Sequence, residues 1–169
     1  MKKIGLLSDT HSYLDPKIFE YFEKCDEIWH AGDIGEASVS DQLSKFKPLK
    51  AVSGNIDGQD IRMLHPVDRI FFCEEVKVFM IHIGGYTGNY FPEAGKKIIE
   101  HKPDLFICGH SHILKVMRDT KYNLLHINPG AAGKSGFHKI KTIVRFDINS
   151  KRIENLEVIE LGLRGEIEK

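Results

Sequence analysis

Short, nearly continuous apolar runs that end at polar residues dominate the first third of the chain. They cover residues 3–9, 27–33 and 49–55, with the sequences KIGLLSD, EIWHAGD and LKAVSGN. A strand that is covered on both faces of a sheet shows this pattern, because neither face meets water. The sequence therefore predicts three buried strands in this region.

Between these runs, apolar residues recur at helical spacing. Ile18 and Phe22 belong to a predicted helix over residues 15–24. A second helix covers the apolar positions of residues 39–46 and ends before Pro48, because the residue preceding a proline is biased away from helical backbone. Alternation of strand and helix predicts right-handed crossovers and a parallel sheet.

The pattern changes in the second half. Residues 54–66 are predicted to be a loop, residues 67–83 two strands joined at Glu74 and Glu75, and residues 92–101 a helix. Strand candidates then follow at residues 104–112, 113–119, 122–130, 141–148 and 152–161. This half favours a more antiparallel sheet. We expect an α/β fold of two packed β-sheets flanked by helices, in a single domain over residues 1–169.

Composition narrows the class of protein without identifying it. Hydrophobic residues make up 41% and charged residues 28%, and 24 basic side chains balance 24 acidic ones. The sequence carries no electrostatic signature for nucleic acid or an anionic membrane. The first apolar run is too short for a secretory signal or a membrane span. Three widely spaced cysteines predict reduced, packed thiols, and we expect a cytoplasmic protein.

Metal-competent side chains gather where the predicted strands end. In open α/β sheets ligands bind at the carboxyl ends of the strands, because loops converge there without disturbing the core. Seven residues have this placement: Asp9, His11, Asp33, Asn55, His82, His110 and His112.

The segment GHSH is the most specific part of this set. In extended backbone, residues i and i+2 face the same way, so His110 and His112 are predicted to project into one volume, as are Asp9 and His11. Other candidate residues also have a purely structural explanation. A helix cap explains Asp33, tight turns explain Asn55 and Asp57, and a buried hydrogen bond explains His82.

Seven ligands are too many for one tetrahedral zinc site and suit two ions. Paired cations share a bridging carboxylate and stabilise both oxygens of a phosphoryl displacement. The mixture of nitrogen and oxygen donors fits Mn, Fe, Ni, Co or Zn rather than Ca.

The order D-x-H, G-D, G-N, H, G-H-x-H, with NPG at 128–130, resembles the calcineurin-like metallophosphoesterase family, and in particular its small bacterial phosphodiesterase subgroup. That family has a four-layer α-β-β-α sandwich. The resemblance implies that Asp33 bridges two divalent ions, of which Mn is preferred. It implies further that Asp9, His11 and His112 bind one ion and that Asn55, His82 and His110 bind the other.

The implied reaction is hydrolysis of a small phosphodiester by a hydroxide that bridges the two ions, with Asp33, Asn55 and Asp57 as catalytic candidates. Many family members carry a histidine after the asparagine of G-N, whereas this chain has Ile56. Isoleucine cannot protonate a leaving oxygen, which favours good leaving groups or another acid, with Asp57 nearby in the sequence.

Other functions remain open. GAAGKS at residues 130–135 resembles a nucleotide-binding loop, but only two residues separate its glycines and a strand follows it. A phosphomonoesterase and a non-catalytic scaffold on the same fold are alternatives, and homo-oligomers are possible for either. The complete ligand set favours an enzyme. The remaining candidates are predicted to be surface or structural histidines: His65, His101, His126 and His138.

Overall fold

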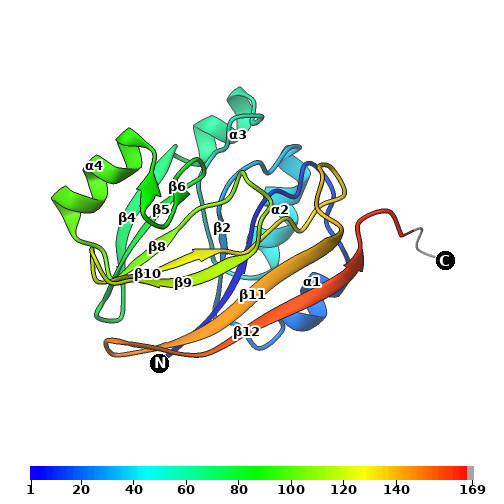
Figure 1. Ribbon diagram of the computed structural model, residues 1–169. Helices are drawn as coiled ribbons and strands as arrows, with labels where there is room; N and C mark the ends of the chain where they lie inside the picture. Colours follow the sequence, from blue (N-terminus) through cyan, green and yellow to red (C-terminus); the bar gives the residue numbers. More distant parts are fainter. Residues whose placement is uncertain (167–169) are drawn as a thin grey trace.

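The computed structural model of the chain describes residues 1–166. Two five-stranded mixed sheets pack against each other with helices on their outer sides (Figure 1). The elements in chain order are β1 (Lys2–Leu7), α1 (Lys17–Tyr21), β2 (Glu27–His30), α2 (Ala37–Phe46), β3 (Leu49–Ala51), α3 (Gln59–Leu64), β4 (Asp68–Cys73), β5 (Val76–Ile81), β6 (Gly85–Tyr86), β7 (Asn89–Tyr90), α4 (Pro92–His101), β8 (Leu105–Ile107), β9 (Lys115–Asp119), β10 (Leu124–Asn128), β11 (Ile140–Asn149) and β12 (Arg152–Leu163).

The first sheet has the strand order β12-β11-β1-β2-β3. Strands β1, β2 and β3 are parallel, as their alternation with helices predicts. Strand β11 then pairs antiparallel with β1, and β12 pairs antiparallel with β11. The last two strands therefore extend the first sheet, although the sequence pattern grouped them with the second half of the chain.

The second sheet has the order β4-β5-β8-β10-β9. Its central strands β5, β8 and β10 are parallel, and only the edge pairs β4–β5 and β9–β10 are antiparallel. The expectation of a more antiparallel sheet is therefore correct only at the edges. Helix α4 is the reason, because this crossover returns the chain so that β8 enters the sheet in the direction of β5.

Three apolar clusters hold the layers together. One lies between the sheets and includes Trp29 and Val78. A second joins the first sheet to α1 and α2 through Ile18 and Leu43. The third joins the second sheet to α4 through Ile98. Burial on both faces of each sheet explains why the strands read as continuous apolar runs, and it confirms the four-layer α-β-β-α architecture.

Some local predictions are wrong. Residues 54–66 contain the short helix α3, whose only buried residue is Ile61, so no apolar periodicity marks it in the sequence. A small hairpin, β6–β7, occupies residues 85–90. Helix α1 covers only Lys17–Tyr21 of the expected residues 15–24.

The state of the cysteines and the length of the helices bear on the chain as a whole. All three cysteines are free and buried, as predicted for packed thiols. Within residues 1–166, no helix combines the length and apolar character that a membrane span requires.

Candidate metal centre

The seven candidate ligands lie at one edge of the molecule, where five strands end. Strands β1, β2 and β3 of the first sheet and β5 and β8 of the second lead into this edge, called the rim below (Figure 1). Each candidate follows one of these strands by a few residues, as the sequence predicts: Asp9, His11, Asp33, Asn55, His82, His110 and His112.

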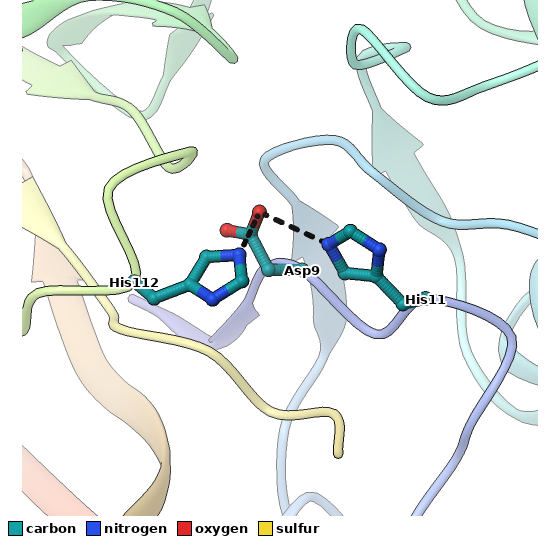
Figure 2. Close-up of side chains that lie close together, drawn as sticks. All are labelled: Asp9, His11 and His112. Carbon is teal, nitrogen blue, oxygen red and sulfur yellow. Dashed lines mark ion pairs between the residues drawn. The ribbon is translucent and has the colours of Figure 1, made fainter. Parts of the chain in front are cut away.

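The first group consists of Asp9, His11 and His112, and their candidate ligand atoms lie within 4.8 Å of one another. Oδ1 of Asp9 is 3.2 Å from Nε2 of His112 and 3.8 Å from Nε2 of His11. Figure 2 shows both imidazoles pointing toward this carboxylate. A carboxylate and two imidazoles thus face a volume of the size that one cation occupies.

The second group consists of Asp33, His82 and His110, again with ligand atoms within 4.8 Å. Oδ2 of Asp33 is 3.2 Å from Nε2 of His82. Asn55 joins this group, since its Oδ1 lies 3.0 Å from Nδ1 of His110.

Asp33 also faces the first group. Its Oδ2 is 3.4 Å from Nε2 of His11, so one carboxylate oxygen lies between an imidazole of each group. This is the position that a bridging ligand of a paired cation site requires.

Five of the seven residues have positive φ angles, a region that residues other than glycine seldom adopt: Asp9 (53°), His11 (45°), Asp33 (54°), His110 (71°) and His112 (59°). Such conformations cost on the order of 1–3 kcal/mol each and persist where the surrounding structure imposes them. The strain is concentrated at the rim.

This backbone corrects one prediction. His110 and His112 were expected in extended backbone, pointing into one volume. Both are instead left-handed, and they enter different groups. The loop after β8 therefore serves both halves of the rim, through a turn that sequence spacing does not reveal.

Two glycines let the loops approach the carboxylates closely. A Cβ atom at Gly54 would collide with Oδ1 of Asp33, and one at Gly109 would collide with Ser8 beside Asp9. Any side chain at these positions would force the loops after β3 and β8 away from the carboxylates.

Several buried polar atoms at the rim have no hydrogen-bond partner among the described residues. They are Oδ1 of Asp9, Nε2 of His11 and Nε2 of His82. Buried polar atoms are normally satisfied, and an unpaired buried carboxylate oxygen is costly. Asp9 and His11 belong to the first group and His82 to the second, so one cation in each group would satisfy all three atoms.

Burial alone would raise the pKa of Asp9, but the side chains of His11 and His112 and the charge of His82 lower it well below its usual range. The pKa of Asp33 is also lowered, against its burial, by His82. Both carboxylates are therefore ionised at neutral pH. Asp9 in turn raises the pKa of His11, and a cation bound at the rim would compete with that proton.

Surrounding groups fix the orientation of the candidate ligands. Nδ1 of His82 lies 2.7 Å from the carbonyl oxygen of Ala31, which leaves Nε2 facing the rim. Oδ2 of Asp9 accepts hydrogen bonds from the Ser8 hydroxyl at 2.6 Å and from the His110 N–H at 3.1 Å. Outer contacts of this kind orient metal ligands in proteins. The residues present therefore fit a pair of divalent transition-metal ions.

Both oxygens of the Asp57 carboxylate accept hydrogen bonds from backbone N–H groups. Oδ2 accepts from the N–H groups of Gly54 at 2.7 Å and Ile34 at 3.2 Å, and Oδ1 accepts from Gly35 at 2.8 Å. Asp57 thus ties the loop after β2 to the loop after β3. These contacts favour a positioning role over the catalytic role expected from the sequence.

Arg62 is a rim residue that the sequence did not indicate. Its Nε donates to the Asp57 carbonyl at 2.7 Å and its Nη2 donates to the Gly54 carbonyl at 3.1 Å. Both bonds hold the loop that carries Asn55. Arg62 lies on α3, and the only available signal was an arginine in a segment predicted to be a loop.

Two further residues support the loop after β8. Nδ2 of Asn128 donates to the Gly109 carbonyl and to the Ser111 hydroxyl, each at 3.1 Å. The His138 ring packs edge-on against His112, with ring centroids 5.1 Å apart. The NPG segment therefore acts on the rim through loop support.

Comparison with known proteins agrees with the fold. A family model described as the calcineurin-like phosphoesterase superfamily domain matches residues 1–151. A probable metallophosphoesterase of Methanothermobacter thermautotrophicus is 28% identical over 135 residues, which is 76% of each chain. Another from Methanocaldococcus jannaschii is 27% identical over 168 residues, covering 93% of this chain and 81% of the relative.

Solved structures show the same architecture. An archaeal phosphodiesterase superposes with a TM-score of 0.73 at 26% identity, covering 94% of this chain and 99% of that one. Vps29 of Chaetomium thermophilum superposes with a TM-score of 0.74 at 16% identity, covering 95% and 97%. At that identity the second likeness concerns the fold alone.

Proposed function

The chain belongs to the calcineurin-like phosphoesterase superfamily, and we propose that it is a phosphodiesterase that works with two divalent metal ions at the rim. The observation that carries this proposal is the place of Asp33. One of its carboxylate oxygens lies 3.4 Å from Nε2 of His11 in the first group and 3.2 Å from Nε2 of His82 in the second.

In this proposal the first group holds one ion, and Asn55, His82 and His110 hold the other, with Asp33 shared. When bound, two such ions supply Lewis acidity toward the phosphoryl oxygens and an acidified water as nucleophile. Manganese is the ion that we favour. The protein contributes two ionised carboxylates, fixed imidazole orientations and a preformed loop geometry.

The identity of residue 56 bears on the choice of substrate. The Ile56 side chain is exposed and cannot donate a proton, and the Asp57 carboxylate is occupied by three backbone N–H groups. General acid catalysis is worth roughly 10²- to 10⁴-fold in rate. We therefore expect a preference for esters whose leaving group needs little protonation.

A diester is favoured over a monoester for two reasons. The archaeal structural neighbour with 26% identity is described as a phosphodiesterase. A monoester also carries more negative charge than a diester and calls for more basic groups, whereas Arg62 lines the adjoining cleft together with the acidic Glu93.

The test uses purified protein that is stripped of metal and reloaded with Mn²⁺. Hydrolysis of bis(4-nitrophenyl) phosphate is compared with that of 4-nitrophenyl phosphate. We expect metal-dependent turnover with the diester preferred. A strong preference for the monoester would make the protein a phosphomonoesterase. Protein that holds two ions yet hydrolyses neither ester with any divalent metal would instead indicate a binding role.

A further inference from the structure

A cleft of about 570 Å³ opens directly beside the second group. Asn55 and His82 are among the residues that line it, so a phosphoryl group at the rim would adjoin the cleft. Its volume lies within the range of pockets that hold small organic ligands.

The wall of the cleft is apolar. Val67, Ile83 and Phe91 line it, and these side chains are 55%, 36% and 43% exposed. They come from three separate segments: the connection before β4, the residues after β5 and the start of α4. Large apolar side chains that converge on a hollow from different segments mark a ligand site more often than chance exposure does.

The charges in the cleft nearly cancel. Arg62 supplies one cation, and two of its five N–H donors are bound to backbone carbonyls. Glu93, in the first turn of α4, supplies one anion. A second phosphate or another polyanion would meet little net positive charge here to offset its desolvation. An uncharged group would have only a small free-energy cost of desolvation on entering the cleft.

We propose that this cleft binds an organic group of the phosphodiester, and that this group is uncharged, largely apolar and of ring size. The inference rests on the proposed function, because it places the phosphorus at the rim. Phe91 contributes an aromatic ring to the lining, and Val67 and Ile83 contribute further apolar surface. The cleft would therefore select diesters by their organic group.

Equilibrium binding separates this inference from catalysis. Diphenylphosphinate and dimethylphosphinate carry the same anionic centre, and their carbon–phosphorus bonds resist hydrolysis. Titration calorimetry on Mn²⁺-loaded protein is expected to show diphenylphosphinate binding roughly 10- to 100-fold more tightly, because burial of a phenyl ring is favourable. Equal affinities would overturn the inference.

Variants of the cleft residues test whether the preference for diphenylphosphinate arises in the cleft. Phe91→Ala is expected to reduce the preference for the diphenyl compound by about 5- to 20-fold, and the uncharged polar change Val67→Asn by a similar factor, with dimethylphosphinate affinity unchanged. Phe91→Leu should retain part of the preference. Phe72→Ala is the matched control, since Phe72 is an exposed phenylalanine on β4 that does not line this cleft. An unchanged preference in the Phe91 and Val67 variants would overturn the inference.

Turnover gives the second readout. Methyl 4-nitrophenyl phosphate and phenyl 4-nitrophenyl phosphate share a leaving group, and we expect a lower KM for the phenyl compound that rises in Phe91→Ala. Turnover of both with equal KM would reject the cleft and keep the phosphodiesterase. Selective phosphinate binding without any turnover would keep the cleft as an organic-anion site and reject the phosphodiesterase.

Discussion

His126 and the histidines of the rim differ in how their ring nitrogens are satisfied. Below the β6–β7 hairpin, His126 is fully buried, with Nδ1 2.9 Å from the Thr87 hydroxyl and Nε2 3.3 Å from Sγ of Cys108. At the rim, Nε2 of His11 and Nε2 of His82 are buried and make no hydrogen bond within residues 1–166, although both lie beside the ionised Asp33 carboxylate. An imidazole whose two nitrogens both have hydrogen-bond partners stabilises the fold. A buried imidazole nitrogen that makes no hydrogen bond and lies beside a carboxylate is instead suited to bind a cation.

Backbone conformation also distinguishes His126 from the rim. His126 lies in β10 in regular register with its neighbours. Five of the seven candidate ligands at the rim, all except Asn55 and His82, have left-handed φ angles. Residues far from the rim, such as Glu74 and Lys102, also have positive φ angles. At the rim, however, these conformations aim several side chains at a shared volume, which is a recognised relation between strain and function.

Asp33→Asn should break the rim most severely. It removes the negative charge that both groups face, so we expect activity to fall on the order of 10²- to 10³-fold. The melting temperature should fall slightly, because the folded state lowers the pKa of Asp33 and so favours its ionised form. Steady-state hydrolysis of the activated diester checks the first expectation and calorimetry the second. Full activity in this variant would contradict a shared carboxylate.

Replacing His112 at the rim and His126 in β10 by glutamine tests whether only the rim histidine binds metal. His112→Gln should weaken one metal site by roughly 10- to 100-fold and lower the ion content from about two to about one. His126→Gln should keep both ions but lose stability. Elemental analysis after dialysis measures the ions. If His112→Gln retains two ions, the ligand lies elsewhere.

Asp57→Asn tests whether Asp57 holds the rim loops in position or transfers a proton in the reaction. The amide cannot accept all three backbone hydrogen bonds, so we expect a loss of roughly 1–3 kcal/mol in the free energy of unfolding. Activity should fall without a change in the shape of its pH profile. Loss of one limb of that profile, with stability unchanged, would instead assign proton transfer to Asp57.

The smallest expected effect concerns pH. Burial lowers the pKa of His126 to about 4, below the unfolded value near 6.5. The unfolded chain therefore binds the proton first as pH falls, and stability should decrease from about pH 6.5 toward about pH 4. Between pH 7 and pH 5 this amounts to roughly 1–2 kcal/mol. Urea unfolding of the wild type and of His126→Gln measures it, and equal pH slopes would refute this assignment.

The sequence predicted the rim better than its surroundings. Apolar runs mark the strand ends, and parallel strands bring Asp9, Asp33 and Asn55 to one edge whatever the details of the loops. The bounds of α4 were also predicted correctly, because its apolar face and Pro92 are local signals.

The remaining features depend on contacts between distant segments. Helix α3 contributes only Ile61 to the core, where it packs in the same cluster as residues of α1 and α2, so no periodicity marks the helix. The pairing of β11 with β1 depends on which sheet edge is open. The left-handed turns at His110 and His112 depend on loop closure around Asp9, and no spacing rule predicts them.

Crystals soaked in Mn²⁺ measure most directly whether the rim holds a pair of cations. Anomalous difference density is expected at two positions, one among the first group and one among His82, His110 and Asn55, with the Asp33 carboxylate between them. Density at a single position, or at a place that Asp33 does not touch, would contradict the shared site.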